Sequence, residues 1–507
     1  MSGFHKDNAR IFRNTLVIYV RMLFIIVIGL LCTRYVLAAL GKSDYGLYSV
    51  VGGLVAMLGF LSTAMSTTTR RFINTELGKP DGDPNRMFNI CLTVHFALAG
   101  FILLLAETLG LYYIYHWLNV DPARLKDAVF VFQVSVFAAC INIINLPYMS
   151  LMEAFEKFLQ TSVVDIVSNL FRLVAVVWLL KFFKGDGLRL YALIMASMTL
   201  ISMVMYRVYC RRHWDGIIKW RPVKSGYREV VSFNNYTALS AAAYIARSQG
   251  STLIVNYFFG TVVNSALSVA YQIENFSVTS VNRLTSAASP QITKNYSGGD
   301  TARSLDLVYK ISRYSALLMS VLVFCAWVEL DFVLGIWLKD VPEGAVLFTR
   351  WTLVSALVRS FVGGTQALEQ ATGRIKWFQI WNSAMSLLCL PLGFAAYKFG
   401  APVVTIIQLY ICYSILYRFV EFALLRRLIG FDALDYCRRA YLGPAAVVAL
   451  LTAFVFLYRA VMPAEMSAAG HLAGILWTFA VSACAVFFLG LGAGERKKLK
   501  EYVFNKK

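Results

Sequence analysis

The sequence predicts an all-α polytopic membrane protein with about fourteen transmembrane helices, and two observations lead to this prediction. The 507 residues are 58% hydrophobic and have a mean hydropathy of +0.62, whereas a soluble globular domain is roughly 45–50% apolar. The apolar residues also gather in runs long enough to span a bilayer, separated by short polar or basic stretches. The length of the chain is therefore no guide to a number of soluble domains.

The first half of the chain contains six predicted spans. They cover about residues 14–40, 45–69, 88–117, 127–152, 161–183 and 188–209. Residues 78–84, which include two prolines and two glycines, form the loop before the third span, and residues 184–187 form a tight turn before the sixth. A basic polar stretch over residues 211–229 then separates the two halves.

The second half contains eight predicted spans. They cover about residues 230–259, 262–292, 307–334, 345–371, 377–397, 403–425, 442–457 and 471–491. The net charge of +20 could indicate nucleic-acid binding, but the basic residues fall between the apolar runs. With the N-terminus inside, the cytoplasmic segments hold about 31 Lys and Arg residues and the opposite loops about 9. We therefore predict that both termini are cytoplasmic and that nucleic acid is not a partner.

Motifs for metal, cofactor or nucleotide chemistry are missing from the sequence. The nine cysteines form no C-x-x-C, and the five histidines form no H-E-x-x-H, so neither a metal site nor a disulfide framework is predicted. No G-x-x-x-x-G-K-[ST] is present, which makes ATP an unlikely energy source. We expect no cofactor, and the source of energy stays open among ion gradient, membrane potential and passive exchange.

A short internal sequence similarity relates the two halves. Gly41 after the first span and Gly260 after the seventh are 219 residues apart, and nearby Ser and Val residues coincide in the same register. Many transporters contain two structural repeats. We predict an N-terminal six-helix lobe, a basic cytoplasmic linker, a C-terminal six-helix lobe related to the first by a pseudo-two-fold repeat, and two additional helices with a basic tail. These divisions comprise residues 1–210, 211–229, 230–427 and 428–507.

Charged residues inside the predicted spans are the candidate functional residues, because such charges are costly and usually face the bundle interior or a water-filled cavity. The candidates for binding an anionic substrate are Arg21, Arg34, Arg172, Arg247, Arg283 and Arg359. The candidates for a gate or for ion coupling are Glu274 and Asp165. An anionic group such as a phosphate suits arginine, whose planar guanidinium is always charged and donates bidentately.

Several of these residues have a second interpretation. Arg34 either lies in a cleft or snorkels to the outer interface. Arg172 shares a helix face with Asp165, so it either makes a structural ion pair or faces the lumen. Arg247 and Glu274 are predicted at similar depth, as a static bridge or as a gate for which a phosphate competes. Near a helix end, we expect Arg418 and Glu421 to form a surface pair.

The two candidates in the first span cannot both face one side. Arg21 and Arg34 are thirteen residues apart, which is about 20 Å and roughly 220° around a straight helix. Either Gly29 bends the helix, or only one arginine faces the lumen. Arg21 shares its face with Asn14 and Cys32, so it is the better lumen candidate.

Four segments carry a resemblance to a known family. They read Arg34…Leu40-Gly41-x-x-x-Tyr45-Gly46-Leu47-Tyr48-Ser49, Phe259-Gly260-x-x-x-Asn264-Ser265-Ala266-Leu267, Glu156-Lys157 and Ala371-Thr372-Gly373-Arg374. In these segments the chain resembles the bacterial polysaccharide flippases for O-antigen and other lipid-linked oligosaccharides. This family lies within the multidrug/oligosaccharidyl-lipid/polysaccharide exporter superfamily, and the resemblance covers nearly the whole chain.

The resemblance implies two six-helix lobes around a central cleft and alternating access. It implies a transporter that flips undecaprenyl-pyrophosphate-linked oligosaccharide from the cytoplasmic to the outer leaflet of the bacterial inner membrane. The implied partners are the lipid-linked oligosaccharide, membrane lipids, and the glycan polymerase and glycosyltransferases of the same pathway.

Two other functions are weighed against the flippase. A multidrug and toxin extrusion antiporter would need an acidic cavity for cationic drugs, and Asp165 and Glu274 are few for that purpose. A membrane-embedded glycan polymerase or ligase would need a substantial outer loop with acceptor-site residues. The predicted outer loops are all short, and no nucleophile or carboxylate pair stands out, so we do not expect an enzyme.

Overall fold

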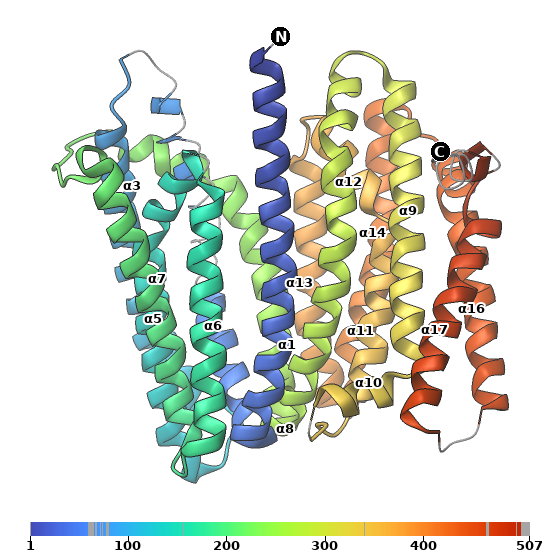
Figure 1. Cartoon of the computed structure of the whole chain (residues 1–507), viewed down its shortest axis with the longest axis horizontal. Helices are drawn as coiled ribbons and strands as arrows, with labels where there is room; N and C mark the ends of the chain where they lie inside the picture. The colour runs from blue at the N-terminus through green and yellow to red at the C-terminus, as the bar shows by residue number, and fades with distance from the viewer. Residues whose placement is uncertain are drawn as a thin grey trace. The chain divides into compact units, whose positions relative to one another are not determined.

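The structure is a computed structural model, and the elements it describes are all helical (Figure 1). It describes the backbone of residues 2–497 apart from 59–64, 66–67, 71, 74, 78–80, 156, 339, 463–465 and 493. Side chains are described from residue 24 onward, with further gaps at 229, 231–244, 283, 286–287, 290, 294 and 297. The all-α class predicted from the sequence is confirmed.

Eleven helices within these described residues are long and apolar enough to cross a membrane, or up to twelve if the bent pair α11 and α12 is one span. The sequence analysis counted fourteen spans because it separated the segments on either side of Gly41 and of Gly260. The structure joins those segments into two long, broken helices, α1 and α8. Each of these two helices therefore contains two of the predicted spans.

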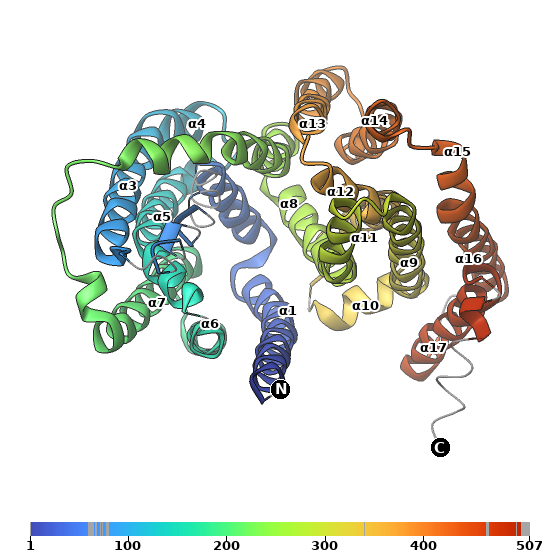
Figure 2. The same ribbon diagram turned by 90° about the horizontal axis from the view of Figure 1, so that it is seen from above.

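The chain forms two compact units, and unit 1 comprises Met1–Ser265 with Trp337–Pro342. Its helices are α1 (Ser2–Leu58), α3 (Pro84–Leu105), η1 (Ala106–Gly110), α4 (Leu111–His116), η2 (Pro122–Arg124), α5 (Leu125–Ala154), α6 (Phe158–Phe182), α7 (Gly187–Ile218) and the first part of α8 (Tyr227–Ser297). Within this unit α6 packs against α1, and α5 packs against α3 and α7 (Figure 2).

Unit 2 comprises Ala266–Ile336 and Glu343–Lys507. After the rest of α8, its helices are α9 (Thr301–Val328), α10 (Leu330–Trp337), α11 (Ala345–Ser360), α12 (Gly363–Ala371), α13 (Lys376–Lys398), α14 (Thr405–Ile429), α15 (Ala433–Tyr436), η3 (Cys437–Tyr441), α16 (Leu442–Val461), α17 (Ala468–Ala485) and η4 (Val486–Gly490). Within it α9 packs against α11, α12, α16 and α17. The predicted boundary at residues 211–229 stays a prediction, although α7 continues to Ile218.

Helix starts follow from local sequence. Asp83 caps α3 by accepting a hydrogen bond from the Arg86 amide at 2.9 Å, and Pro84 occupies the first helical position. Asp186 caps α7 in the same way through the Leu188 amide at 3.0 Å. The polar turns predicted before the third and sixth spans are thus helix-initiating segments.

Gly41 and Gly260, the two glycines of the internal sequence similarity, adopt nearly the same backbone conformation. Gly41 has φ 77° and ψ 173°, and Gly260 has φ 77° and ψ −174°. This region of φ and ψ is essentially restricted to glycine, because a Cβ there collides with its own backbone. Nothing else lies within 4 Å of a Cβ built at either position. Glycine is therefore required at both breaks by the backbone conformation, and not by a steric contact with another residue. The matching conformations are consistent with the predicted repeat.

The segments that follow these breaks touch each other inside unit 1. A Cβ built on Gly46 would lie 1.7 Å from the Thr261 carbonyl oxygen, so the two backbones approach as closely as a glycine permits. The Ser43 Oγ and Thr261 Oγ1 atoms are hydrogen-bonded at 3.0 Å. Close approach through glycine is a common way to pack helices in a membrane. We call the contact of Gly46 and Ser43 with Thr261 the glycine joint.

Replacement of Gly46 by alanine should destabilise unit 1, because the added methyl group would force α1 and α8 apart. We expect a loss of about 1–3 kcal/mol, as for other overpacked sites. Gly52→Ala is the matched control, since it lies on the same helix and a Cβ there meets nothing within 4 Å. The measurement is thermal unfolding of both purified variants in one detergent. Equal unfolding midpoints for the two variants would contradict the close approach.

Candidate functional site

Arg172 of α6 lies among aromatic groups inside a candidate membrane span. Its Nη2 atom donates a hydrogen bond to the Tyr191 hydroxyl of α7 at 2.9 Å. The Tyr191 ring in turn packs edge-on against Tyr48 of α1, with centroids 4.7 Å apart. The partner that the structure gives this half-buried guanidinium is thus a neutral hydroxyl, and its Nε is buried without a hydrogen bond. Arg172 brings a positive charge and a spare donor into the core of unit 1.

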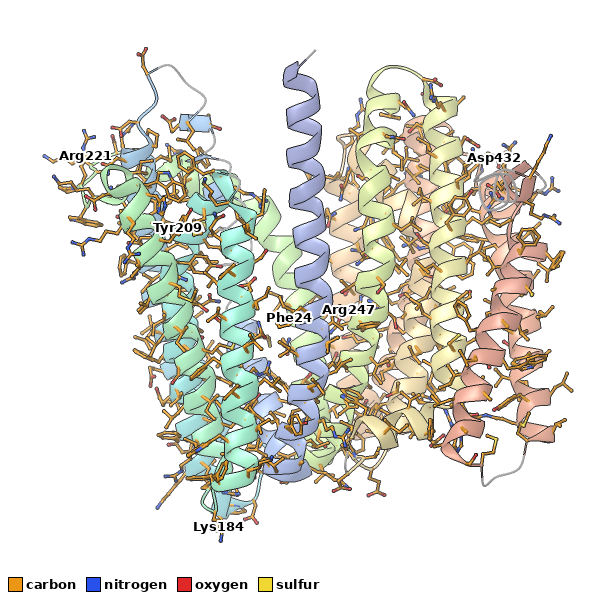
Figure 3. The ribbon with its side chains drawn as sticks, in the orientation of Figure 1. Phe24, Lys184, Tyr209, Arg221, Arg247 and Asp432 are labelled. Atoms are coloured by element: carbon orange, nitrogen blue, oxygen red, sulfur yellow. The ribbon has the colours of Figure 1, made fainter. Side chains whose placement is uncertain are left out.

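The remaining candidates of unit 1 lie on three helices. Arg34 is exposed on α1, and Arg247 is half-buried on α8, where Figure 3 labels it. Asp165 is half-buried on α6, and its backbone carbonyl accepts a hydrogen bond from the side-chain Nδ2 of Asn169 at 2.8 Å. Arg21 belongs to α1, but its side chain lies outside the described residues. The choice between Arg21 and Arg34 as the lumen residue of this helix stays a prediction.

In unit 2 the structure brings together two of the predicted residues, Arg359 and Glu274. Arg359 lies at the end of α11 and forms an ion pair with Glu274 of α8. The arginine side chain is 29% exposed and the glutamate side chain 11%. Arg247, the partner expected for Glu274 from similar depth, belongs to the other unit. The side chain of the last candidate, Arg283, lies outside the described residues.

Arg359 immediately precedes a break in the helix. The axes of α11 and α12 differ by 46°, and Phe361 and Val362 separate them. The break is held against α9: the Gly364 amide donates to the Ser312 Oγ at 3.0 Å, and a Cβ on Gly364 would lie 2.2 Å from the Val308 carbonyl oxygen. Broken helices of this kind bring polar backbone and charged groups together at transporter sites.

Close to this break, a second charged cluster is buried. Arg418 of α14 forms an ion pair with Glu421, whose side chain is 0% exposed, and it also donates to Thr365 Oγ1 at 3.4 Å. Glu369 of α12 is 6% exposed and interacts electrostatically with both. The prediction that Arg418 and Glu421 form a surface pair is therefore wrong. Their helix face packs into unit 2, because α13 and α11 cover α14.

Sequence reasoning did not single out Glu369. It lies inside the predicted span 345–371, so the rule that intramembrane charges are functional candidates applied to it as well. Because Glu369 lies two residues from the end of that span, the sequence analysis did not recognise it as a charge inside the membrane. In the structure a new helix, α12, begins after the break at 361–362, and Glu369 is buried on it two residues from its end.

A third charged cluster lies in unit 1 where three helices begin or turn. Arg124 forms ion pairs with Asp44 at 2.5 Å, Asp127 at 2.7 Å and Asp186 at 2.9 Å. Arg189 joins it through Asp127 at 2.6 Å. Asp44 belongs to the segment between Gly41 and Gly46, so this cluster ties the glycine joint to α5 and α7. The sequence analysis missed it because Asp44 and Arg124 are 80 residues apart.

Among the residues the structure describes, no three His, Cys, Asp or Glu side chains are grouped so as to hold a metal ion. The charged groups of the two units are instead arranged as arginines with hydroxyl or carboxylate partners. Such groups can bind an anion directly or exchange one carboxylate for another.

Comparison with known proteins places this arrangement in a fold. The sequence matches no protein-family model and no curated protein. The structure is similar to that of a multidrug resistance MATE family transporter of the MOP superfamily in an inward-facing conformation, with a TM-score of 0.66 and 12% identity over 82% of this chain and 96% of that chain. It is similar to the lipid II flippase MurJ in an inward closed conformation, with a TM-score of 0.66 and 13% identity over 93% of this chain and 98% of that chain.

A third similar structure is an outward-facing conformation of a multidrug resistance MATE family transporter of the MOP superfamily. Its TM-score is 0.58, with 12% identity over 83% of this chain and 95% of that chain. Because all three identities are low, these comparisons define the fold and not the cargo. The chain has the fold of these transporters, and its membership of the superfamily that the sequence resembles stays a prediction.

Replacement of Arg418 by alanine should destabilise the protein strongly, because it leaves Glu421 buried without its ion-pair partner. We expect a loss of about 3–5 kcal/mol. Arg70→Ala is the control, because it removes an exposed ion pair with Glu153, whose loss costs about 0–1 kcal/mol. Thermal unfolding of both variants measures the difference. A similar small effect of the two substitutions would mean that the Arg418 pair is accessible to water.

Proposed function

We propose that the protein is a flippase that moves undecaprenyl-pyrophosphate-linked oligosaccharide from the cytoplasmic to the outer leaflet of the bacterial inner membrane by alternating access. The observation that carries the proposal is the half-buried Arg172 guanidinium, whose hydrogen-bond partner is the neutral Tyr191 hydroxyl. The similarity to a structure titled as a lipid II flippase over 93% of this chain is consistent with a lipid-linked cargo.

The chemical argument rests on the cost of a charge inside a membrane. A guanidinium there is retained where it has a function or a compensating partner. A pyrophosphate supplies the missing negative charge and accepts parallel hydrogen bonds from a planar donor. In this proposal the cargo's pyrophosphate binds to intramembrane arginines, which are Arg21, Arg34, Arg172, Arg247, Arg283 and Arg359. Exchange among several arginines avoids trapping the cargo at one of them.

The ion pair of Arg359 with Glu274 suits a gating role. A guanidinium that already binds a carboxylate takes up a phosphate only when that carboxylate is displaced. We propose that the pyrophosphate competes with Glu274 for Arg359, and that Asp165 is a second residue for gating or ion coupling. Because Arg359 adjoins the break between α11 and α12, exchange of its partner can be coupled to movement at that bend.

The proposed pathway context follows from the cargo. A lipid-linked repeat unit is built by glycosyltransferases and consumed by a glycan polymerase, so these are the partners we propose. Membrane lipids surround the protein, and both termini are proposed to be cytoplasmic. We assign no catalytic residue, because flipping changes the position of the cargo and breaks none of its bonds.

A multidrug antiporter is the second candidate, and one observation favours it. Glu369 and Glu421 are buried acidic residues in unit 2, and the sequence analysis did not count them when it judged the protein too poor in carboxylates for cationic drugs. The MATE transporters are as similar in fold as the lipid II flippase. Transport assays must therefore separate the two candidates.

Replacement of Arg172 by glutamine should block flipping. We expect lipid-linked oligosaccharide to accumulate in the inner leaflet and surface glycan to fall by roughly ten- to a hundredfold, as for the loss of a charged hydrogen bond of about 1.5–3 kcal/mol. Arg172→Lys should keep part of the activity, because it retains the charge without the bidentate geometry. Arg70→Gln is the control, since Arg70 lies outside the candidate spans. Normal surface glycan with normally expressed R172Q protein would disprove the role of Arg172.

Efflux of a cationic dye separates the second candidate from the first. We expect proteoliposomes of the purified protein to leave ethidium transport at the background level, with or without a proton gradient, because the proposed binding groups repel cations. If the protein is an antiporter, ethidium movement will exceed background and will fall in the Glu369→Gln variant. Dye transport that depends on Glu369 would replace the flippase by the antiporter.

A further inference from the structure

A basic cavity lies in unit 2, and none of the charged residues described above is in its wall. Its volume is about 290 Å³, and it lies between the N-terminal half of α9, the π-helix η3, the start of α16, and the π-helix η4 with the turn after it. The four basic side chains in its wall are Lys310, Arg313, Arg438 and Arg439, against one acidic side chain, Asp306. Three of these basic side chains have carboxylate partners: Lys310 has Asp306, Arg439 has Asp435 and Arg313 has Glu495. The four basic side chains thus exceed these acids by one, and the wall has a small excess of positive charge.

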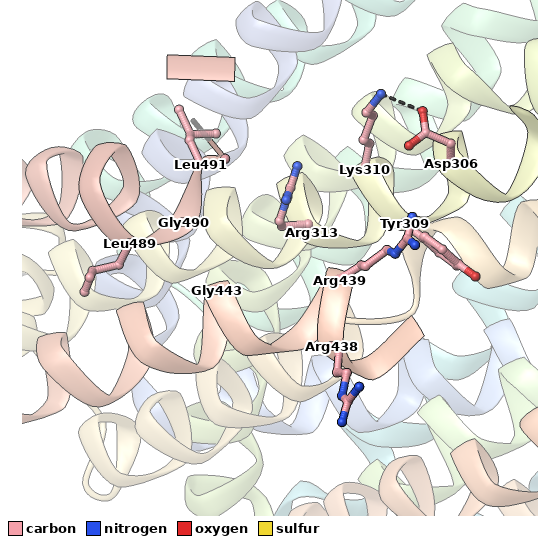
Figure 4. A pocket seen from close by; sticks show the side chains of 11 residues that line it. Asp306, Tyr309, Lys310, Arg313, Arg438, Arg439, Gly443, Leu489, Gly490 and Leu491 are labelled. Carbon is pink, nitrogen blue, oxygen red and sulfur yellow. Dashed lines mark hydrogen bonds and ion pairs between the residues drawn. The ribbon is translucent and has the colours of Figure 1, made fainter. Parts of the chain in front are cut away.

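The described contacts of these side chains leave donors for a ligand. Arg439 binds Asp435 through its Nε at 2.9 Å, so its two terminal nitrogens remain available. Lys310 binds Asp306 at 2.6 Å through one of its three ammonium hydrogens. Figure 4 shows the Lys310 amine beside Asp306 and the Arg439 side chain extended toward Tyr309, whereas Arg438 points away from them. Lys310 and Arg439 thus keep N–H donors that their carboxylate partners do not use, so a phosphate can bind them beside Asp306 and Asp435 without displacing either acid.

Both π-helical segments of unit 2 take part in this wall. Arg438 and Arg439 belong to η3, and Leu489 and Gly490 belong to η4. A π-helical turn is costly and is found mostly at functional positions. The start of α16, directly after η3, packs closely on η4, because a Cβ on Gly443 would lie 3.3 Å from the carbonyl oxygens of Leu489 and Gly490. The backbone geometry that shapes the cavity is therefore unusual on two sides of it.

Large exposed apolar side chains lie in the cavity wall or next to wall residues in the sequence. Leu489 of the wall is 44% exposed, and its neighbour Phe488 is 61% exposed. Leu442, which precedes Gly443 of the wall, is 63% exposed. The predicted topology, with both termini inside, puts this end of unit 2 at the cytoplasmic surface of the membrane. A basic pocket beside exposed apolar side chains at that surface matches an anionic lipid, whose phosphate and acyl chains meet there. A free phosphate would make no use of the apolar border.

We propose that this cavity binds the headgroup of an anionic phospholipid from the cytoplasmic leaflet, with Lys310 and Arg439 as donors to its phosphate. The acyl chains lie along the exposed side chains of η4 and α16. The site is separate from the proposed cargo residues, and it holds the two additional helices α16 and α17 to α9 through a shared lipid. The proposal does not depend on the identity of the cargo.

The test uses the purified full-length protein and phosphatidylglycerol as the probe. Binding is measured by native mass spectrometry and by the shift of the unfolding midpoint on addition of phosphatidylglycerol, with phosphatidylcholine as the uncharged comparison. The test variant is K310Q/R439Q. The control is R426Q/R427Q, which removes two exposed arginines from the last turn of α14 and changes the net charge equally.

We expect phosphatidylglycerol to bind the wild type and the control equally, and to bind K310Q/R439Q about tenfold more weakly. The single variants K310Q and R439Q each lose one exposed ion pair between residues four apart, so they fold and should each weaken binding. Inorganic phosphate should not reproduce the shift of the wild type. Equal binding by K310Q/R439Q and the wild type would overturn the site, and an equal shift with inorganic phosphate would overturn its assignment to a lipid.

Discussion

The close approach of Gly46 to the Thr261 carbonyl is the constraint on which unit 1 depends. The two helices that meet there are each broken at a glycine, Gly41 or Gly260, in a conformation that other residues rarely adopt. The ion pairs of Arg124 then attach the same turn to α5 and α7 through Asp44, so four helices share one fixed point. The chain leaves unit 1 within α8 directly after this point, at Ser265. The Gly41–Gly46 turn is accordingly a structural joint, and its resemblance to a family motif reflects backbone geometry and not ligand binding.

The arginines of the membrane spans differ in what already neutralises them. Arg172 has the neutral Tyr191 hydroxyl as its partner, Arg359 has Glu274, and Arg418 has the fully buried Glu421. A carboxylate that neutralises an arginine competes with an incoming anion, so we expect the affinity of these three arginines for a phosphate to decrease in that order. In the proposed flippase, Arg172 would therefore bind the cargo, Arg359 would exchange partners, and Arg418 would stabilise the fold.

The sequence allowed the helical class, the turns at Gly41 and Gly260 and the approximate bounds of many spans to be predicted, because apolar runs and turns rich in glycine and proline are local signals. It did not allow partners to be assigned. In a membrane helix both faces are apolar, so the hydrophobic pattern does not tell which way Arg418 and Glu421 point. Glu274 lies at a depth that several arginines share, and depth alone does not select Arg359. Asp44 and Arg124 are 80 residues apart, and no periodicity relates them. The π-helical turns η3 and η4 have no sequence signature, so the cavity that they line could not be predicted from the sequence.

The buried acids of unit 2 do not by themselves decide the sign of the cargo. Glu369, Glu421 and Arg418 form one cluster in which two carboxyl groups lie near a single guanidinium. Arg418 gives Glu421 an ion-pair partner inside the protein, so a cationic drug would have to compete with that guanidinium for the carboxylate. The residue that separates the two proposed functions is therefore Arg172 of unit 1, whose charge would stabilise an anionic headgroup and repel a cationic drug.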